Sequence, residues 1–234
     1  MERISPPAHE LLEKLGITFS YNTRYDKDLH ISYTMNWRPT SPVQILTEER
    51  QGSVSERGFV IDADSGKALN LRGGRGSSRQ GILSREISAG PLAEGTNRIL
   101  FKSRTLFAML EAPEFAFDFK MGASPETVSV KQKFIYDDVE FMIEEIVFDK
   151  NEFTVRYSQL TPPAEVGVYQ LSFAFDDRLG HVWRTTPDVK LAVRNPKEYT
   201  MTVPNTPSKN WTLLVEHVVL VIPGIETEIT VREE

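Results

Sequence analysis

The sequence predicts an all-β fold: two tandem immunoglobulin-like β-sandwich domains preceded by a short N-terminal helix. Short segments of alternating apolar and polar residues recur along the chain, and turn signals separate them at short intervals. A weak internal repeat points the same way. Phe59–Leu69 aligns without a gap on Phe173–Trp183, and Tyr25–Tyr33 resembles Phe148–Tyr157 with one inserted residue. Two matches in the same order predict two copies of one β domain.

Residues 1–16 are predicted to form a helical segment. Ser5 can cap the helix, and Pro6 and Pro7 suit its first turn, where a missing N–H costs nothing. Gly16 marks its end. One apolar stripe comprises Leu11, Leu12 and Leu15. The stripe predicts a helix packed on a domain edge, or a segment close to a membrane.

The first β domain is predicted over residues 17–123. Tyr25–Asp28 is a hairpin signal, and Asp62–Gly66 is a turn in which Asp side chains can accept hydrogen bonds from nearby amides. The predicted strands include Ile17–Tyr21, Leu29–Met35, Phe59–Ile61, Ile99–Phe101 and Phe115–Phe119. The last of these places three Phe residues on one face, as the final strand of a sandwich would.

The second β domain is predicted over residues 124–234, after a linker at Met121–Glu126. A hairpin is expected at Asp149–Asn151. The predicted strands include Val128–Val130, Val139–Phe148, Phe153–Tyr157, Tyr169–Phe175, Trp211–Val221 and Ile225–Val231. The missing Cys…Trp…Cys framework predicts an immunoglobulin-like shape rather than a true immunoglobulin domain.

Composition indicates a soluble globular protein. Of 234 residues, 40% are hydrophobic and 26% charged. The longest apolar run, Val218–Ile222, is far shorter than the ~20 residues of a membrane helix. Met1–Pro7 lacks the features of a signal peptide. Two explanations stay open: a cytoplasmic protein, or a soluble part that follows a membrane anchor absent from this chain.

Charge and cysteine content narrow the classes of function. The formal net charge is −6, with 16 Lys+Arg against 15 Asp+Glu in residues 1–123 and 11 against 18 in residues 124–234. An acidic second half argues against a nucleic-acid surface, because a phosphate backbone needs a basic face. The chain has no Cys, which excludes disulfides, thiolate metal sites and Cys nucleophiles.

The polar motifs do not predict catalysis, a metal or a cofactor. Carboxylates are adjacent at Asp137–Asp138, Glu144–Glu145 and Asp176–Asp177, and neighbours on a strand point to opposite faces. Asp62 and Asp64 offer oxygen ligands for calcium, but the second copy has an Arg in place of Asp64. The four His are scattered, and no Gly-x-Ser-x-Gly motif accompanies the Ser residues. The three Trp are interpreted as core residues.

Leu71–Gly81 is the only segment of biased composition, with Arg72, Arg75 and Arg79 among glycines and serines. We interpret the segment as a long mobile hairpin loop, as is typical of Gly/Ser-rich stretches. The three arginines are the candidate contacts with an anion or a partner. An anionic envelope polymer, lipid headgroups or an acidic protein are the partners that this charge suits.

The Ser-Pro-containing helix and the strand–hairpin–strand signatures at Tyr25–Tyr33 and Val139–Tyr157 resemble a known group. This group is the extracytoplasmic region of uncharacterised Gram-positive membrane proteins, chiefly of Bacillus-like organisms, some of them described as anti-sigma-factor-like. The resemblance implies a tandem of β domains held outside the membrane by a segment that this chain lacks. It supplies no catalytic residues.

The expected function is therefore a non-enzymatic binding or sensory module of a membrane-anchored bacterial protein, which regulates an envelope-stress response. The expected partner is an unknown protein or an envelope polymer, not a nucleic acid. The alternative is a structural spacer or adhesin-like stalk at the cell surface. A carbohydrate-active or peptidase accessory enzyme would need a pocket with converging carboxylates.

Overall fold

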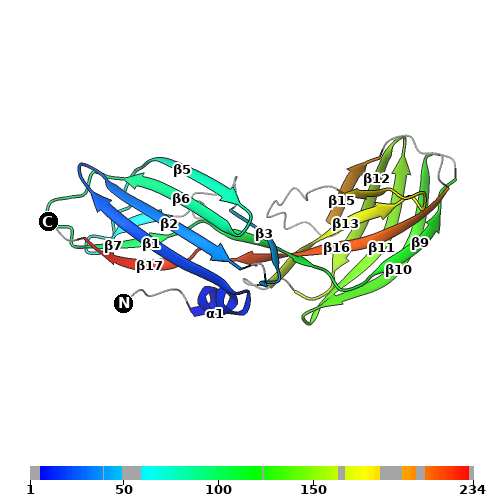
Figure 1. Ribbon diagram of the computed structural model, residues 1–234, viewed down its shortest axis with the longest axis horizontal. Helices are drawn as coiled ribbons and strands as arrows, with labels where there is room; N and C mark the ends of the chain where they lie inside the picture. Colours follow the sequence, from blue (N-terminus) through cyan, green and yellow to red (C-terminus); the bar gives the residue numbers. More distant parts are fainter. Residues whose placement is uncertain are drawn as a thin grey trace. The chain divides into compact units, whose positions relative to one another are not determined.

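The computed structural model describes residues 6–38, 40–48, 59–122, 124–162, 167–184, 197–203 and 209–231. Within these ranges the chain forms one short helix and otherwise antiparallel β-sheets, which confirms the predicted all-β class. The chain divides into two compact units (Figure 1). The first unit comprises Met1–Ala108 and Val221–Glu234, and the second unit comprises Met109–Leu220.

The helix α1 (Pro6–Lys14) is confirmed within one residue of its predicted end. Leu12 and Leu15 are buried, so the apolar stripe faces the domain as expected. Gly16 follows with a φ of 66°, a left-handed conformation that Gly adopts readily at the end of a helix. The predicted cap, Ser5, lies outside the described residues.

One sheet of the first unit has four strands in the order β1 (Ile17–Tyr25), β2 (Leu29–Trp37), β6 (Ile82–Ala89) and β5 (Leu71–Arg79). The predicted hairpin joins β1 to β2, with Tyr25 opposite Leu29. Alternate residues of β2 are buried, which orients the sheet with one apolar and one polar face. The buried residues of β2 are Leu29, Ile31, Tyr33, Met35 and Trp37.

The other sheet of the first unit has the order β17 (Glu226–Thr230), β7 (Arg98–Lys102) and β4 (Phe59–Asp62). The rings of Tyr33 on β2 and Phe101 on β7 lie 5.5 Å apart, centroid to centroid, and both side chains are buried. The apolar faces of the two sheets therefore pack together and give this unit a sandwich-like core.

The C-terminal strand belongs to a different unit from the one predicted, because the sequence analysis assigned all of residues 124–234 to the second domain. β17 pairs with β7 in the first unit. Glu226 reaches Lys102 at 2.7 Å, and Glu228 reaches Arg98 at 3.4 Å, so opposite charges face each other across the outer side of the pair. Ile225, Thr227 and Ile229 alternate with these acids and are buried.

One sheet of the second unit has the order β10 (Glu126–Tyr136), β11 (Val139–Asp149), β12 (Glu152–Gln159) and β15 (Lys197–Thr202). The predicted hairpin at Asp149–Asn151 joins β11 to β12, with Asp149 opposite Glu152. Phe153, Val155 and Tyr157 on β12 are fully buried, whereas the residues between them are half-exposed.

A further sheet has the order β14 (Val182–Arg184), β13 (Gly167–Asp176), β16 (Asn210–Ile222), β8 (Leu106–Glu111) and β3 (Val43–Glu48). The division between the units falls within β8 and β16. β9 (Ala116–Lys120), predicted as the last strand of the first domain, pairs with β16 in the second unit. The predicted linker at Met121–Glu126 therefore lies inside the second unit.

An aromatic cluster fills the core of the second unit. The ring of Phe153 on β12 stacks on Phe175 of β13 at 4.4 Å and meets Trp211 of β16 edge-on at 4.9 Å. Trp211 and Trp37 are buried, which confirms that these two tryptophans fill the core. Trp183, on the short strand β14, is only partly buried.

Candidate functional site

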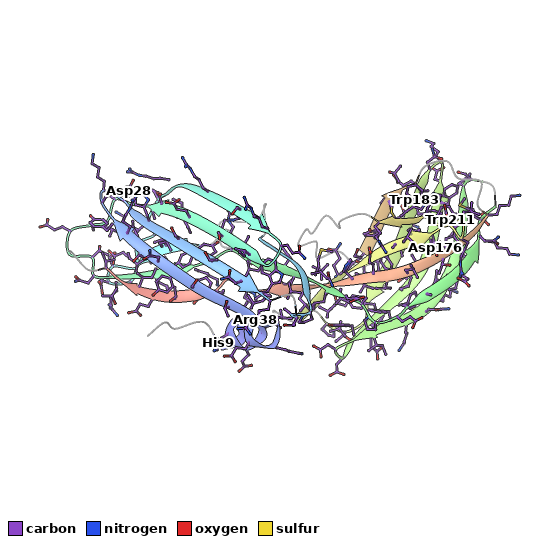
Figure 2. All side chains as sticks on the ribbon, in the orientation of Figure 1. His9, Asp28, Arg38, Asp176, Trp183 and Trp211 are labelled. Carbon is purple, nitrogen blue, oxygen red and sulfur yellow. The ribbon has the colours of Figure 1, made fainter. Side chains whose placement is uncertain are left out.

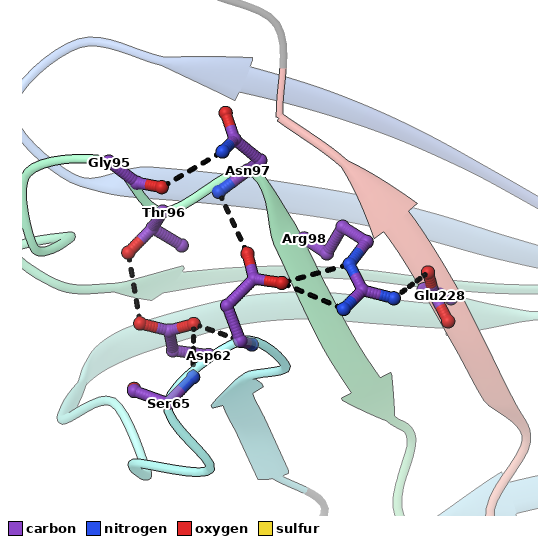
Figure 3. Close-up of polar contacts among 8 residues, drawn as sticks. Asp62, Ser65, Gly95, Thr96, Asn97, Arg98 and Glu228 are labelled. Atoms are coloured by element: carbon purple, nitrogen blue, oxygen red, sulfur yellow. Dashed lines mark hydrogen bonds and ion pairs between the residues drawn. The ribbon is translucent and has the colours of Figure 1, made fainter.

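The Asp62–Gly66 turn, considered for calcium, is occupied by hydrogen bonds from the protein itself (Figure 3). Asp62 accepts hydrogen bonds from the amides of Asp64 at 2.9 Å and Ser65 at 3.2 Å, and from the Thr96 hydroxyl at 3.0 Å. Asp64 accepts two hydrogen bonds from the Arg98 guanidinium, at 2.8 and 2.9 Å. These carboxylates hold the end of β4 to β7, so we assign them a structural role.

Hydrogen bonds lower the pKa of both carboxyl groups. A hydrogen bond from the Ser65 side chain is the largest cause at Asp62, and the hydrogen bond from the Arg98 side chain is the largest at Asp64. Arg98 in turn has a raised pKa because it faces Asp64 and also Glu228. Within the described ranges, no group of three or more His, Asp and Glu side chains is arranged to hold a metal ion.

A similar turn follows β13 in the second unit. Asp177 is buried, and its carboxylate accepts hydrogen bonds from the amides of Leu179 at 2.8 Å and His181 at 3.1 Å. The imidazole of His181 lies 3.0 Å from the second oxygen of Asp177. Burial acts to raise the pKa of Asp177, but the hydrogen bonds together lower it. Among the described contacts, the carboxylate of its sequence neighbour Asp176 accepts one hydrogen bond, from the Arg178 amide.

The segment with the candidate arginines is a strand, so its interpretation as a mobile loop is wrong. Leu71–Arg79 forms β5 and pairs with β6 from Leu71↔Ala89 to Arg79↔Ile82. The hairpin turn is confined to Gln80 and Gly81, whose φ is 80°. Gly and Ser have a low preference for strands, but pairing with β6 along its whole length overrides it.

The three arginines occupy different settings on β5. Arg72 lies at an irregularity in the pairing, and its guanidinium contacts Asp28 at 3.2 Å. Arg75 and Arg79 stand opposite Glu86 and Ile82, on the polar face of the sheet. Both are exposed, and neither forms an ion pair with a described residue. The structure therefore leaves two of the three candidate guanidinium groups open to an external anion.

β5 is also an edge strand, because β6 is its only neighbour in the described sheet. An edge strand presents main-chain N–H and C=O groups on its outer side. On the apolar side of the sheet, the Arg85 side chain extends over Gly76; a Cβ on that glycine would lie 2.3 Å from the Arg85 Cδ. The Arg85 side chain therefore occupies the space that a side chain at position 76 would fill.

A second candidate site lies in the second unit, where three separate segments meet. A cavity of about 440 Å³ is lined by Asp118, Phe119, Lys120, Arg178, Asn210 and Trp211. The first three belong to β9, the last two to the start of β16, and Arg178 to the turn after β13; Trp211 is labelled in Figure 2. The register places Lys120 opposite Asn210 and Phe119 opposite Trp211.

Charged groups dominate the rim of this cavity. Asp118 Oδ1 accepts a hydrogen bond from the Thr212 hydroxyl at 2.8 Å and another from the Arg178 guanidinium. Both contacts lower the pKa of Asp118, and the hydrogen bond from Thr212 is the larger cause. Lys120 forms no side-chain contact of this kind with a described residue. The rim thus carries two cations against one anion.

Sequence reasoning missed Asp118, Lys120 and Asn210. The alternation of Phe117, Asp118, Phe119 and Lys120 shows that the two charged side chains share the polar face of a strand. Nothing in the sequence shows that this strand pairs with residues near position 210, because long-range strand pairing leaves no local signal.

Several other polar residues singled out in the sequence lie in turns or contact nearby residues. Asp137 and Asp138 form a turn with φ of 48° and 66°, and Glu145 contacts Arg156 at 2.7 Å. His9 lies 3.0 Å from Glu13, and His30 lies 3.3 Å from Asp26. Lys197, which lies at the start of β15, has an unusual pKa. Burial of its ammonium group lowers the pKa to about 8. Its ammonium group donates to Gln159 at 3.2 Å.

The chain was compared with protein-family models, curated proteins and solved structures, and no match was found in any of them. The resemblance to extracytoplasmic regions of Gram-positive membrane proteins therefore stays a prediction. Among the described residues, no helix combines the length and the apolar character needed to span a membrane.

Proposed function

We propose that the chain is a non-enzymatic binding or sensory module that recognises an acidic, extended segment of a partner protein along β5. The observation that carries the proposal is the combination of an open sheet edge with Arg75 and Arg79, two exposed guanidinium groups without described ion-pair partners. An extended segment would add a strand to the sheet through its main chain.

The side chains of β5 favour such an added strand. Gly73, Gly74 and Gly76 carry no side chain, so little obstructs the approach of another backbone. Arg75 and Arg79 are two strand repeats apart, about 13 Å, which matches acidic side chains at every fourth residue of an extended partner.

The same charge determines which partners are disfavoured. Edge strands commonly carry charged residues that prevent association with an identical edge. Two copies of β5 would bring arginines against arginines, whereas an acidic strand is attracted. The charge on β5 therefore distinguishes an acidic partner from a second copy of this chain.

The proposal is tested by calorimetric titration of the whole chain with a nine-residue peptide of alternating Glu and Val. We expect binding that weakens as salt is added, and that weakens about three- to tenfold when Arg75 and Arg79 are both replaced by Ala. Arg24→Ala provides the matched control, since Arg24 is an exposed arginine on β1 at the opposite edge of the same sheet.

A second peptide separates strand pairing from simple charge attraction. N-methylation of every residue keeps every Glu but removes the main-chain donors on both sides of the peptide. We expect this peptide not to bind. Equal binding of both peptides, or an Arg24→Ala effect equal to that of the β5 variant, would contradict recognition at this edge. Polyphosphate binding without peptide binding would favour an envelope polymer instead.

We propose that each unit is an immunoglobulin-like sandwich, and that the protein is anchored in a bacterial membrane and acts in an envelope-stress response. The paired sheets in each unit support the first statement, and the sequence resemblance supports the second. Reading the complete gene tests the location: a membrane segment before Ile4 is expected, and a gene without one favours the cytoplasmic alternative.

A structural spacer is the second candidate function. Two segments of the chain, within β8 and β16, connect the units, whereas a simple tandem has one connection. Small-angle scattering with and without the acidic peptide distinguishes the two functions. A profile that changes on binding supports a sensor, and a profile that stays the same favours a spacer.

A further inference from the structure

We propose that the cavity at β9, β16 and the turn after β13 binds a small ligand through its carboxylate or phosphate group. This site lies in the second unit, apart from β5, and is independent of the proposed partner recognition. The cavity, of about 440 Å³, is large enough for a small organic anion.

The donors needed for an oxyanion converge on this cavity from separate strands. Lys120 and Arg178 each contribute a cation, and Asn210 contributes an amide. Arg178 uses one guanidinium nitrogen on Asp118, and the group has five N–H donors in all, so others stay available. A guanidinium and an ammonium group on one rim suit a carboxylate or a phosphate, both of which accept several charge-assisted hydrogen bonds.

The position of Arg178 is held by the protein before any ligand arrives. Its φ of 58° lies in the left-handed region, where residues other than Gly are uncommon. Its amide donates to Asp176 at 2.8 Å, and its guanidinium contacts Asp118, which Thr212 also holds. A cation fixed at both backbone and side chain loses little freedom on binding an anion.

The charge of the site contrasts with that of its surroundings. Residues 109–220 contain 11 Lys+Arg against 17 Asp+Glu, whereas the cavity has two cations and one anion. An acidic unit that places two cations on one cavity concentrates its attraction for anions there.

The test uses three small probes on the complete chain, followed by NMR. Phenyl phosphate and benzoate carry the two anionic groups on the same ring, and benzyl alcohol carries none. We expect at least one anion to shift the signals of Lys120, Arg178 and Asn210, and benzyl alcohol to leave them unchanged. Binding of phenyl phosphate alone assigns a phosphate ligand, and binding of benzoate alone assigns a carboxylate.

Two variants locate the binding. Lys120→Ala and Arg178→Gly should each lower the affinity for the anion about tenfold or more, which is the loss expected for a charge-assisted hydrogen bond. Lys150→Gly is the matched control, because Lys150 is also a cation in a turn, with a φ of 59°. Gly suits both conformations, so both variants should fold.

Two results would overturn the proposal: no shift at the cavity with either anion, or equal weakening by Lys150→Gly and Arg178→Gly. The Arg75→Ala/Arg79→Ala variant should bind the small anion as the unaltered chain does. Failure of anion binding at the cavity leaves peptide binding at β5 intact, and failure at β5 leaves the cavity intact, so the two proposals are separable.

Discussion

Asp62 and Asp177 are buried carboxylates that close similar turns, one in each unit. The Asp62 amide donates to the carbonyl of Lys67, and the Asp177 amide donates to the carbonyl of His181. Each carboxylate accepts hydrogen bonds from amides of its own turn. The ungapped sequence repeat aligns Asp62 with Asp176. The hydrogen bonds show instead that Asp177 is the structural counterpart of Asp62, and that its turn is one residue shorter.

We predict that Asp62→Asn and Asp177→Asn each lower the urea concentration at the midpoint of unfolding. An amide oxygen keeps the shape of the side chain but accepts more weakly than a carboxylate, and the new NH₂ group faces amide donors. Asp138→Asn is the control, because Asp138 is an exposed turn residue with a φ of 66°, which Asn tolerates. Equal midpoints for all three variants would show that the buried turn carboxylates do not stabilise the fold.

Stability should fall in acid because these carboxyl groups have lowered pKa values. The pKa of Asp62, Asp64 and Asp177 lies below 3.8 in the folded chain, and that of Asp26 falls to about 2 because the amides of Asp28 and Lys27 donate to it. The folded state binds fewer protons than the unfolded state, so their contribution is complete above about pH 4 and is lost as pH falls through the folded pKa.

The measurement is the free energy of unfolding between about pH 5 and pH 2. The double variant Asp62→Asn/Asp177→Asn should show a shallower decrease than the unaltered chain, because two of the titrating groups are gone. A decrease of equal slope in both proteins would contradict the assignment.

Phe153→Ala should destabilise the second unit by about 3–5 kcal/mol. Phe153 on β12 is fully buried, and its ring contacts Phe148, Phe175 and Trp211. Loss of the ring leaves a cavity that this cluster cannot close fully. Phe148→Ala removes a half-exposed ring from the edge of the same cluster and should cost less. An equal cost for the two substitutions would contradict the described core.

Gly224→Ala tests the assignment of the C-terminal strand to the first unit. A Cβ at Gly224 would lie 2.0 Å from the backbone oxygen of Ser103. Beside it, the Ser103 amide donates to the Ile225 carbonyl and the Ile225 amide donates to the Ser103 hydroxyl. The clash is with backbone, which cannot rotate away, so we expect a loss of about 1–3 kcal/mol in the free energy of unfolding. At Gly122 a Cβ would meet only the end of the Glu126 side chain, so Gly122→Ala should be tolerated. A neutral Gly224→Ala would contradict the close approach.

Local patterns in the sequence were sufficient for several elements. The helix at α1, the hairpins after Tyr25 and after Asp149, and the alternating strands follow from capping, turn and periodicity signals that act over a few residues. The turn at Asp62 was also predicted, because Asp and Gly at this spacing favour amide–carboxylate hydrogen bonds.

Strand partners were not predictable in the same way. β17 joins β7 because its buried Thr227 and Ile229 and its two Glu residues match that strand, and the match is visible only when both strands are known. The β5 segment resembles a linker in composition, but its neighbour β6 makes it a strand. The cavity residues come from three segments that only the folded sheet brings together.

Partner binding is proposed at β5, an open edge of the first sheet. Amide hydrogen exchange of the complete chain, measured with and without the Glu/Val peptide, tests it most directly. We expect slower exchange at alternate amides within Leu71–Arg79, and no change on β1, the other edge of that sheet. Peptide binding that leaves every β5 amide unchanged, or that slows exchange on β1 instead, would contradict the claim.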